Sequence, residues 1–399
     1  MRPFAIATLI GLCLALPACA GLYSPDEQFS FELGADGYAK PIYYGGGFDL
    51  MVTEYGAAGI RPRNPDDPPN DVRGKYQTRV QQRLKKGIAT LPPDELAGLT
   101  SDLIRLGRAD EALNILQPLA RDARRGGFLA FTHLAGAHAA RGEWGDARDQ
   151  QQMAVRFSEF PTSFARLTKP QLAWLKRVER DYYLPFLAGR AEEARGRRPG
   201  DARLREDVDP IFPSSSSKRT EEPLRFVGDD GTYAAGKLAA AELKKLPPDA
   251  IAIVQQLLIW HPKDPRLHWL LGELYNASGD VESAAAILDA VTFNMGYSNP
   301  VVIEHRRVLK SAADAAMAAR AQEAAQVAAD AARERELQQE EIARQQQAER
   351  DYQKRFWWII AIGVALGLLL VYYQFREVVR RFRRAFGNWR ASRRKPEVS

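Results

Sequence analysis

Histidine is the residue type in this chain best suited to acid–base or metal chemistry, and its five copies are scattered rather than grouped. They are His133, His138, His261, His268 and His305. None belongs to an HExxH motif, and none has a cysteine nearby that could complete a zinc site. His133 and His138 would point ~140° away from each other around a helix, so they do not share a metal site. The sequence therefore predicts no catalytic histidine and no histidine-based metal centre.

The other patterns with chemical potential are weaker still. Asp229 and Asp230 precede Gly231, which is typical of a turn. The glycine run 45–47 has no Lys-Ser or Lys-Thr after it, so it does not make a phosphate-binding loop. Cys13 and Cys19 both lie in the N-terminal apolar segment, so the folded part has no disulfide and no thiolate metal site. We expect no catalytic residues, no cofactor and no metal, and we do not predict an enzyme.

The chain begins with a pattern typical of an export signal. Arg2 precedes an apolar run of residues 4–16, and a Pro-Ala-Cys-Ala sequence follows it. The small residues Ala18 and Ala20 predict cleavage after Ala20. Two alternatives remain open, namely a lipoprotein signal with the lipid on Cys19 and an anchor that is not cleaved.

A second apolar segment lies near the C-terminus. Residues 356–375 read FWWIIAIGVALGLLLVYYQF and contain no charged residue. Twenty helical residues span the ~30 Å hydrocarbon core of a bilayer. The two ends of the segment carry interfacial aromatic residues, namely Trp357, Trp358, Tyr372 and Tyr373. The segment therefore predicts one transmembrane helix.

Charge is concentrated behind that helix. The net charge is +6, and residues 376–399 alone hold nine Lys or Arg and two Glu, so the remainder is close to neutral. This distribution argues against nucleic-acid binding. The positive-inside rule places the tail in the cytoplasm, and the export signal independently places residues 21–355 outside, in the periplasm of a bacterium. The tail either only fixes this orientation or lies as a basic amphipathic helix on anionic lipid, with Phe382, Phe386 and Trp389 on one face.

Between Val80 and Arg190 the apolar pattern is helical, and pairs of helices recur around glycines. Gly107 and Gly142 lie 35 residues apart, as do Ala112 and Ala147, and Leu134 occupies a matching place. A period near 34 residues with two helices per unit is typical of tetratricopeptide repeats.

Residues 261–291 resemble a tetratricopeptide repeat most clearly. The residues that carry the resemblance are Leu271 and Gly272, then Tyr275, Gly279 and Ala284, with Trp269 one place after the usual aromatic position. The resemblance covers roughly 85–160 and 245–300, although Thr100 and Ala135 stand where the first two repeats would have glycine. It implies stacked helical hairpins with these side chains between the helices, and a concave face that holds a protein or peptide partner.

Three other regions differ from the repeats. Residues 21–78 carry short aromatic runs broken by glycine and predict an irregular region, either a strand-bearing cap or an extended arm. Residues 201–233 are rich in serine, proline and charge and predict a linker, unless 165–245 packs as additional irregular helices. Residues 311–355 lack glycine and proline and predict a stalk helix, with a coiled coil and an isolated helix both open.

These patterns together predict an all-α fold: a TPR-like helical-hairpin solenoid with an irregular N-terminal arm, a long Ala/Gln-rich stalk helix and one C-terminal transmembrane helix. The expected segments are a signal peptide at 1–20, an irregular region at 21–78, a TPR-like block at 79–200, a linker at 201–233, a second TPR-like block at 234–310, a stalk at 311–355, a transmembrane helix at 356–375 and a basic tail at 376–399.

The function favoured by this organisation is a membrane-tethered extracytoplasmic scaffold for protein or peptide partners at the cell envelope. Two alternatives remain, namely a structural spacer whose stalk forms homo-oligomers and a membrane-anchored enzyme whose site leaves no recognisable motif. The sequence identifies neither the partner nor the process it serves.

Overall fold

The computed structural model of the 399-residue chain describes residues 22–27, 29–60, 71–122, 127–196, 208–213, 222–228 and 230–392. The predicted signal peptide, with Ala18, Cys19 and Ala20, lies outside these residues. Helices account for most of the described chain, and its strands form one two-residue antiparallel pair. The all-α fold class is therefore confirmed.

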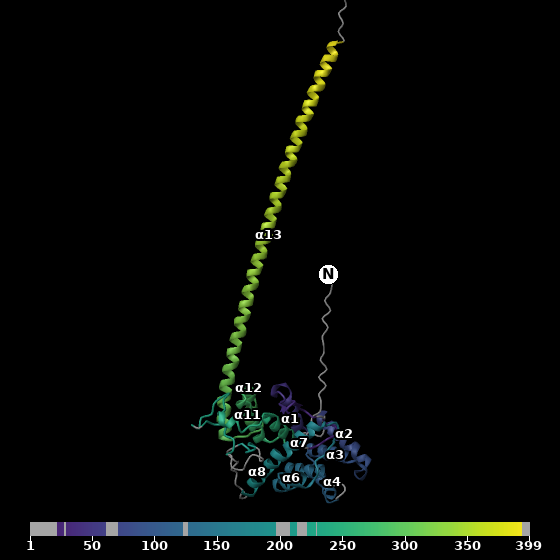
Figure 1. Cartoon of the computed structure of the whole chain (residues 1–399), viewed down its shortest axis with the longest axis vertical. Coiled ribbons are helices and arrows are strands. Elements are labelled where there is room, and N and C mark those ends of the chain that lie inside the picture. Colours follow the sequence, from purple (N-terminus) through teal and green to yellow (C-terminus); the bar gives the residue numbers. More distant parts are fainter. Residues whose placement is uncertain are drawn as a thin grey trace, which may run out of the picture. The chain divides into compact units, whose positions relative to one another are not determined.

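The elements follow in chain order (Figure 1). They are β1 Glu32–Leu33, β2 Ala39–Lys40, η1 Tyr44–Gly46, α1 Phe48–Ala58, α2 Asp71–Lys86, η2 Ile88–Thr90, α3 Pro93–Arg105, α4 Ala109–Arg121, α5 Phe128–Ala140, α6 Trp144–Phe157, α7 Lys169–Val178, η3 Glu179–Tyr183, α8 Leu184–Gly196, α9 Ala240–Leu243, α10 Ala250–Trp260, α11 Pro265–Ala277, α12 Val281–Asp289, η4 Ala290–Asn294 and α13 Pro300–Ser392.

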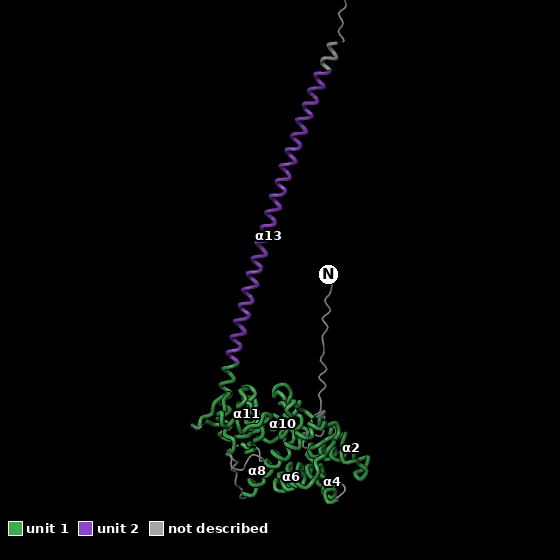
Figure 2. Tube along the Cα trace, viewed as in Figure 1, with its two compact units in different colours: residues 1–316 green, residues 317–399 purple. Residues whose placement is uncertain are grey.

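The chain divides into two compact units, residues 1–316 and 317–399 (Figure 2). Within the first unit, α2, α3 and α4 lie on the right of the view and α11 and α12 on the upper left, with α8 below these two and α6 in the lower middle (Figure 1). One hydrophobic core cluster runs through this unit from Leu22 to Ala313. The two helical blocks expected at 79–200 and 234–310 therefore share one core within a single unit.

Three hairpins of the first unit turn in the same way. Helices α3, α5 and α11 each contain 13 residues. Each ends two residues before a glycine with positive φ, namely Gly107 (73°), Gly142 (77°) and Gly279 (88°). At each turn the glycine N–H and the following N–H donate to carbonyls of the last helical turn, which caps the helix C-terminus. Glycine suits this left-handed conformation because it has no Cβ.

Two segments differ from the sequence-based expectation. Helix α1 lies within 21–78, where an irregular region was expected, because Phe48, Val52, Tyr55 and Ala58 form one buried helical stripe. The described parts of 201–233 are not an exposed linker throughout. Ile211 and Phe212 are each 2 % exposed, since their apolar side chains complete the core.

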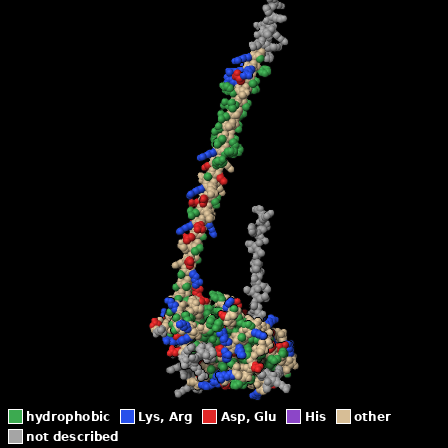
Figure 3. Space-filling model, in the orientation of Figure 1, with side chains coloured by type: hydrophobic (Ala, Val, Ile, Leu, Met, Phe, Trp, Pro, Cys, Tyr) green, Lys and Arg blue, Asp and Glu red, His purple; other side chains and the backbone are tan. Residues whose placement is uncertain are grey.

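The second unit, 317–399, consists of the continuing α13 as far as Ser392. Among the described residues, the Pro300–Ala385 part of this helix is the only stretch long and apolar enough to cross a membrane, and none of its apolar window is buried. Figure 3 shows hydrophobic side chains gathered along one length of α13, between stretches that carry Lys, Arg, Asp and Glu. The interfacial aromatic residues predicted from the sequence are all more than 60 % exposed, namely Trp357, Trp358, Tyr372 and Tyr373.

Candidate functional site

An extended segment at the start of the described chain lies against helices from several hairpins. We call residues 22–27 and 29–44 the N-terminal strap. Near its beginning, Ser101 of α3 donates to the carbonyl of Leu22 over 3.3 Å. Further along, Gln255 of α10 accepts from the Ile42 N–H at 2.9 Å and donates to the Ile42 carbonyl at 2.6 Å. The strap is thus held partly through its backbone, as a bound peptide would be.

Aromatic side chains anchor the strap between these two points. Tyr23 is 2 % exposed, and its ring meets those of Phe128 at 5.8 Å and His133 at 6.5 Å, both on α5. Phe29 and Phe31 pack on Trp174 of α7 with centroid distances of 5.5 and 5.3 Å. Burial of large rings contributes strongly to packing, so the strap belongs to the core.

The buried carboxyl group of Glu179 accepts a hydrogen bond from the strap tyrosine. Tyr23 Oη donates to Glu179 Oε1 over 3.1 Å, and Thr132 and Gln151 also donate to this carboxyl group. Glu179 is 1 % exposed, and burial raises its pKa to about 8, although the three hydrogen bonds act in the opposite direction. Beside it, burial lowers the pKa of His133 to about 3, so this histidine is a neutral core residue.

Ion pairs fasten the strap to α2 and α3. Glu27 meets Arg105 with an Oε1–Nε distance of 3.1 Å, and both side chains are almost fully enclosed. Burial raises the pKa of Glu27 to about 7, while the Arg105 charge opposes this rise. Asp26 pairs with Arg83, which also contacts Asp102 at 2.8 Å. Removing one member would leave a buried charge without its partner, which is strongly destabilising.

In the three hairpins with matching turns, positions at the same distance from the turn glycine are equivalent, and they contact different parts of the chain. In α3, Gly98 and Ser101 lie nine and six residues before the turn glycine. In α5 the residues at these two positions are His133 and Gly136. Those in α3 and α5 contact the strap: a Cβ at Gly98 would lie 2.9 Å from Pro25 Cδ, and one at Gly136 would lie 2.8 Å from Leu22 Cδ2.

In α11 the equivalent positions are Leu270 and Glu273, and both line a cavity of about 390 Å³. We call it the α11 cavity. Its buried wall includes Phe212, Trp269 and His305, and its exposed rim includes Val301. Most of the other lining residues are apolar, namely Val208, Pro210, Pro223, Leu224, Phe226 and Val227, with Asp209, Glu222 and Arg225 as the polar members.

A hydrogen-bonded cluster forms one side of the α11 cavity. Glu273 is completely buried, and its Oε1 accepts from Trp269 Nε1 and lies 2.7 Å from His305 Nδ1. Its Oε2 accepts from Tyr233 Oη at 2.7 Å. The Tyr233 ring stacks on the His305 ring with a centroid distance of 3.6 Å. Because a carboxylate only accepts, Nδ1 of His305 carries a hydrogen and donates to Glu273.

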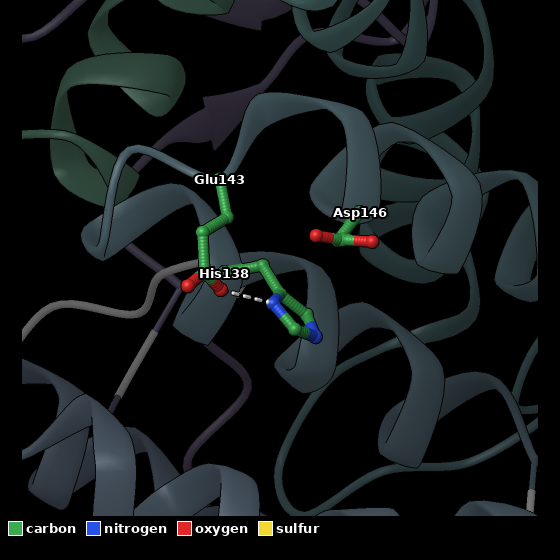
Figure 4. A group of neighbouring side chains, drawn as sticks. All are labelled: His138, Glu143 and Asp146. Atoms are coloured by element: carbon green, nitrogen blue, oxygen red, sulfur yellow. Dashed lines mark hydrogen bonds and ion pairs between the residues drawn. The ribbon is translucent and has the colours of Figure 1, made fainter.

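One group of side chains could hold a metal ion. A ligand atom from each of His138, Glu143 and Asp146 lies within 4.8 Å of the other two, around the turn between α5 and α6. His138 Nδ1 is 2.7 Å from Glu143 Oε2, while Asp146 stands apart from this pair (Figure 4). Arg141 also binds Glu143, at 2.7 Å, so a cation would have to compete with a guanidinium for that carboxylate.

The residues predicted to pack the repeats lie inside the hairpins. Leu134, Ala147, Trp269, Leu271, Tyr275 and Ala284 are all buried. Gly272 permits close approach of α11 and α12, because a Cβ there would lie 2.9 Å from Leu288 Cδ2. Tyr275 also has a role that was not expected, since its hydroxyl donates to the Ile42 carbonyl of the strap at 3.0 Å.

Sequence reasoning missed three features of this surface. His138 comes together with Glu143 and Asp146 across a turn, so the spacing of histidines along one helix does not reveal the group. The His305–Glu273 contact joins α13 to α11, 32 residues apart. The strap contacts leave no local pattern, although the alternation of Tyr23, Phe29 and Phe31 with acidic residues was a signal that an extended segment has buried partners.

Comparison with known proteins identifies one family. Residues 234–294, which include α9 to α12 and η4, match the tetratricopeptide repeat family. No curated protein and no solved structure matches the chain. The match and the helical fold support a tetratricopeptide-repeat-containing protein, and such repeats are typically interaction modules rather than catalytic ones.

Proposed function

We propose that this chain is a membrane-tethered extracytoplasmic scaffold that binds protein or peptide partners at the cell envelope through its tetratricopeptide-type hairpins. The observation that carries the proposal is the repeat match at 234–294, beside hairpins that hold an extended segment, the strap, through backbone hydrogen bonds and buried rings. A surface built to hold an extended chain supports a role in peptide recognition rather than catalysis.

The strap changes where a partner would bind. A concave face that holds a protein or peptide partner was expected, and α3 and α5 already carry the strap at their equivalent positions. Displacing the strap would expose Leu22, Tyr23 and Phe31, and exposing each apolar side chain costs roughly 1.5–3 kcal/mol. We therefore place the partner on surface that the strap leaves uncovered, at the rim of the α11 cavity around Val301.

The tether is the apolar part of α13. Residues 356–375 span the membrane, the basic tail lies in the cytoplasm, and the first unit lies outside. This arrangement is supported by the absence of buried residues in the apolar window and by the basic residues that follow it. Anionic lipid is a second contact for the tail.

Single cysteines test the topology, because both natural cysteines precede Leu22. Glu159→Cys should react with a membrane-impermeant maleimide in intact cells, and Arg384→Cys should react only after permeabilisation. The unsubstituted chain measures the background. Labelling of Arg384→Cys from outside, with Glu159→Cys protected, would contradict the proposed orientation.

Photo-crosslinking tests the scaffold role. A photoreactive amino acid at Val301, on the rim of the α11 cavity, should give a discrete adduct with another protein in intact cells. The same group at Leu337, an exposed position further along α13, is the matched control. Adducts between copies from Leu337, with none from Val301, would instead favour a structural spacer that oligomerises through its stalk.

A further inference from the structure

We propose that His138, Glu143 and Asp146 bind a divalent transition-metal ion, for which Zn²⁺ is the best-suited candidate, at the turn between α5 and α6. A ligand atom from each side chain lies within 4.8 Å of the other two. None of the three belongs to the strap or lines the α11 cavity, so this inference is independent of the proposed scaffold function.

The turn holds the three residues in place before any ion binds. His138 lies in the last turn of α5, Glu143 directly precedes α6, and Asp146 lies in the first turn of α6. The N–H groups of Arg141 and Glu143 both donate to the His138 carbonyl, over 3.0 and 2.9 Å. The His138 side chain is only 13 % exposed. Ligands that are already positioned lose little conformational freedom on binding, which favours affinity.

The donor atoms indicate the class of ion. One imidazole nitrogen with two carboxylates suits Zn²⁺ and its neighbours among the transition metals, whereas Mg²⁺ and Ca²⁺ prefer oxygen ligands alone. Zn²⁺ with three protein ligands keeps a fourth position for water. Bonds to nitrogen and oxygen of about 2.0–2.2 Å at tetrahedral angles place ligand atoms roughly 3–3.5 Å apart. Rotation of the side chains can bring the present spacing to that value.

The two oxygens of Glu143 have different partners. Oε2 lies 2.7 Å from His138 Nδ1, and Arg141 binds the other oxygen, Oε1, at 2.7 Å. The guanidinium therefore leaves Oε2 to the ion, and it orients the carboxylate in the way that hydrogen-bond partners outside the ligand set orient ligating carboxylates.

Charge around the turn also favours a cation. Arg141 is shared between Glu143 and Asp110. Asp146 is exposed and forms no ion pair with any residue of the described chain. One guanidinium thus stands against three carboxylates, and a divalent ion would offset the excess negative charge.

Calorimetric titration of Zn²⁺ into the full-length protein in detergent, purified with a tag that contains no histidine, tests the proposal. We expect saturable binding of one ion per chain that equimolar Mg²⁺ does not prevent. His138→Gln and Asp146→Asn should each weaken Zn²⁺ binding by roughly ten-fold or more. The matched control is Asp149→Asn, which changes an exposed carboxylate further along α6 and should bind Zn²⁺ as the unsubstituted protein does.

Thermal unfolding gives a second readout. An ion that binds only the folded chain stabilises it by mass action, so Zn²⁺ should raise the Tm of the unsubstituted protein and of Asp149→Asn, but not that of Asp146→Asn. Equal Tm values of the two asparagine variants without Zn²⁺ would show that the fold is intact. Absence of saturable Zn²⁺ binding, binding unchanged in both ligand variants, or loss of Zn²⁺ to equimolar Mg²⁺ would each overturn the proposal.

Discussion

Replacing Glu179 with glutamine should remove a strong pH dependence of stability. Burial raises the pKa of Glu179 from 4.5 in the unfolded chain to about 8 in the fold. A carboxyl group with a raised folded-state pKa stabilises the fold fully below the unfolded value, and this stability is lost as the pH rises through the folded value. The sensitive window therefore runs from about pH 4.5 to about pH 8.

The magnitude follows from the size of the rise. One pKa unit corresponds to about 1.4 kcal/mol, so the total loss of stability above pH 8 is roughly 5 kcal/mol. Roughly 2–3 kcal/mol of it is lost between pH 5 and pH 7, where the carboxyl group ionises in the unfolded chain but stays protonated in the fold. Glutamine stays neutral, and its carbonyl can still accept from Tyr23 and Thr132. The variant should therefore be the less stable protein at pH 5 and the more stable one at pH 8.

Urea unfolding of the full-length protein in detergent, followed by tryptophan fluorescence at several pH values, measures this difference. Glu159→Gln, which changes an exposed carboxyl group, is the control and should follow the unsubstituted protein. Free energies of unfolding for Glu179→Gln that run parallel to those of the unsubstituted protein from pH 5 to pH 8 would refute the reasoning.

Three further outcomes are expected. Gly136→Leu should push Leu22 away, which should lower the free energy of unfolding by about 1–3 kcal/mol and speed proteolysis of the strap. Gly189→Leu is the control and should do neither, because Gly189 has open space around it. Equal proteolysis of both variants would argue against strap packing on α5. Tyr23→Phe should cost about 1 kcal/mol in the same unfolding assay, because it deletes the hydrogen bond to Glu179, and an unchanged midpoint would contradict that contact. Leu369→Arg should reduce the alkali-resistant membrane fraction, because inserting arginine at the middle of a membrane span costs roughly 2.5–3.5 kcal/mol. Leu337→Arg should leave that fraction unchanged, and the reverse result would place the span elsewhere.

Local patterns were sufficient for the hairpins. Leu271, Gly272, Tyr275 and Gly279 specify a helix, its close partner and its turn within a single stretch, so the α11–α12 hairpin could be predicted from sequence. Helix α1 could not, because three glycines precede it and Gly56 interrupts it, although its buried stripe packs against α2, α3 and α10. Tertiary packing here overrides a weak intrinsic propensity.

The strap contacts and the α11 cavity could not be predicted from such patterns. Ile42 and Tyr275 are 233 residues apart, and Tyr23 and Glu179 are 156 apart. The α11 cavity likewise combines α11 and α13 with the segments 208–213 and 222–227. Serine- and proline-rich composition pointed to a linker in this region, but Asp209 is held by Arg190 and Arg266, which fixes the backbone beside it.

The strap contacts join residues that lie far apart in the sequence, and this affects how the protein folds. Ile42 of the strap contacts Gln255 of α10 and Tyr275 of α11, which a ribosome adds more than two hundred residues later. Such non-local pairing slows folding and leaves apolar surface uncovered in the meantime. Until α10 and α11 are complete, the strap lacks these partners, so chaperones should engage the chain during that interval.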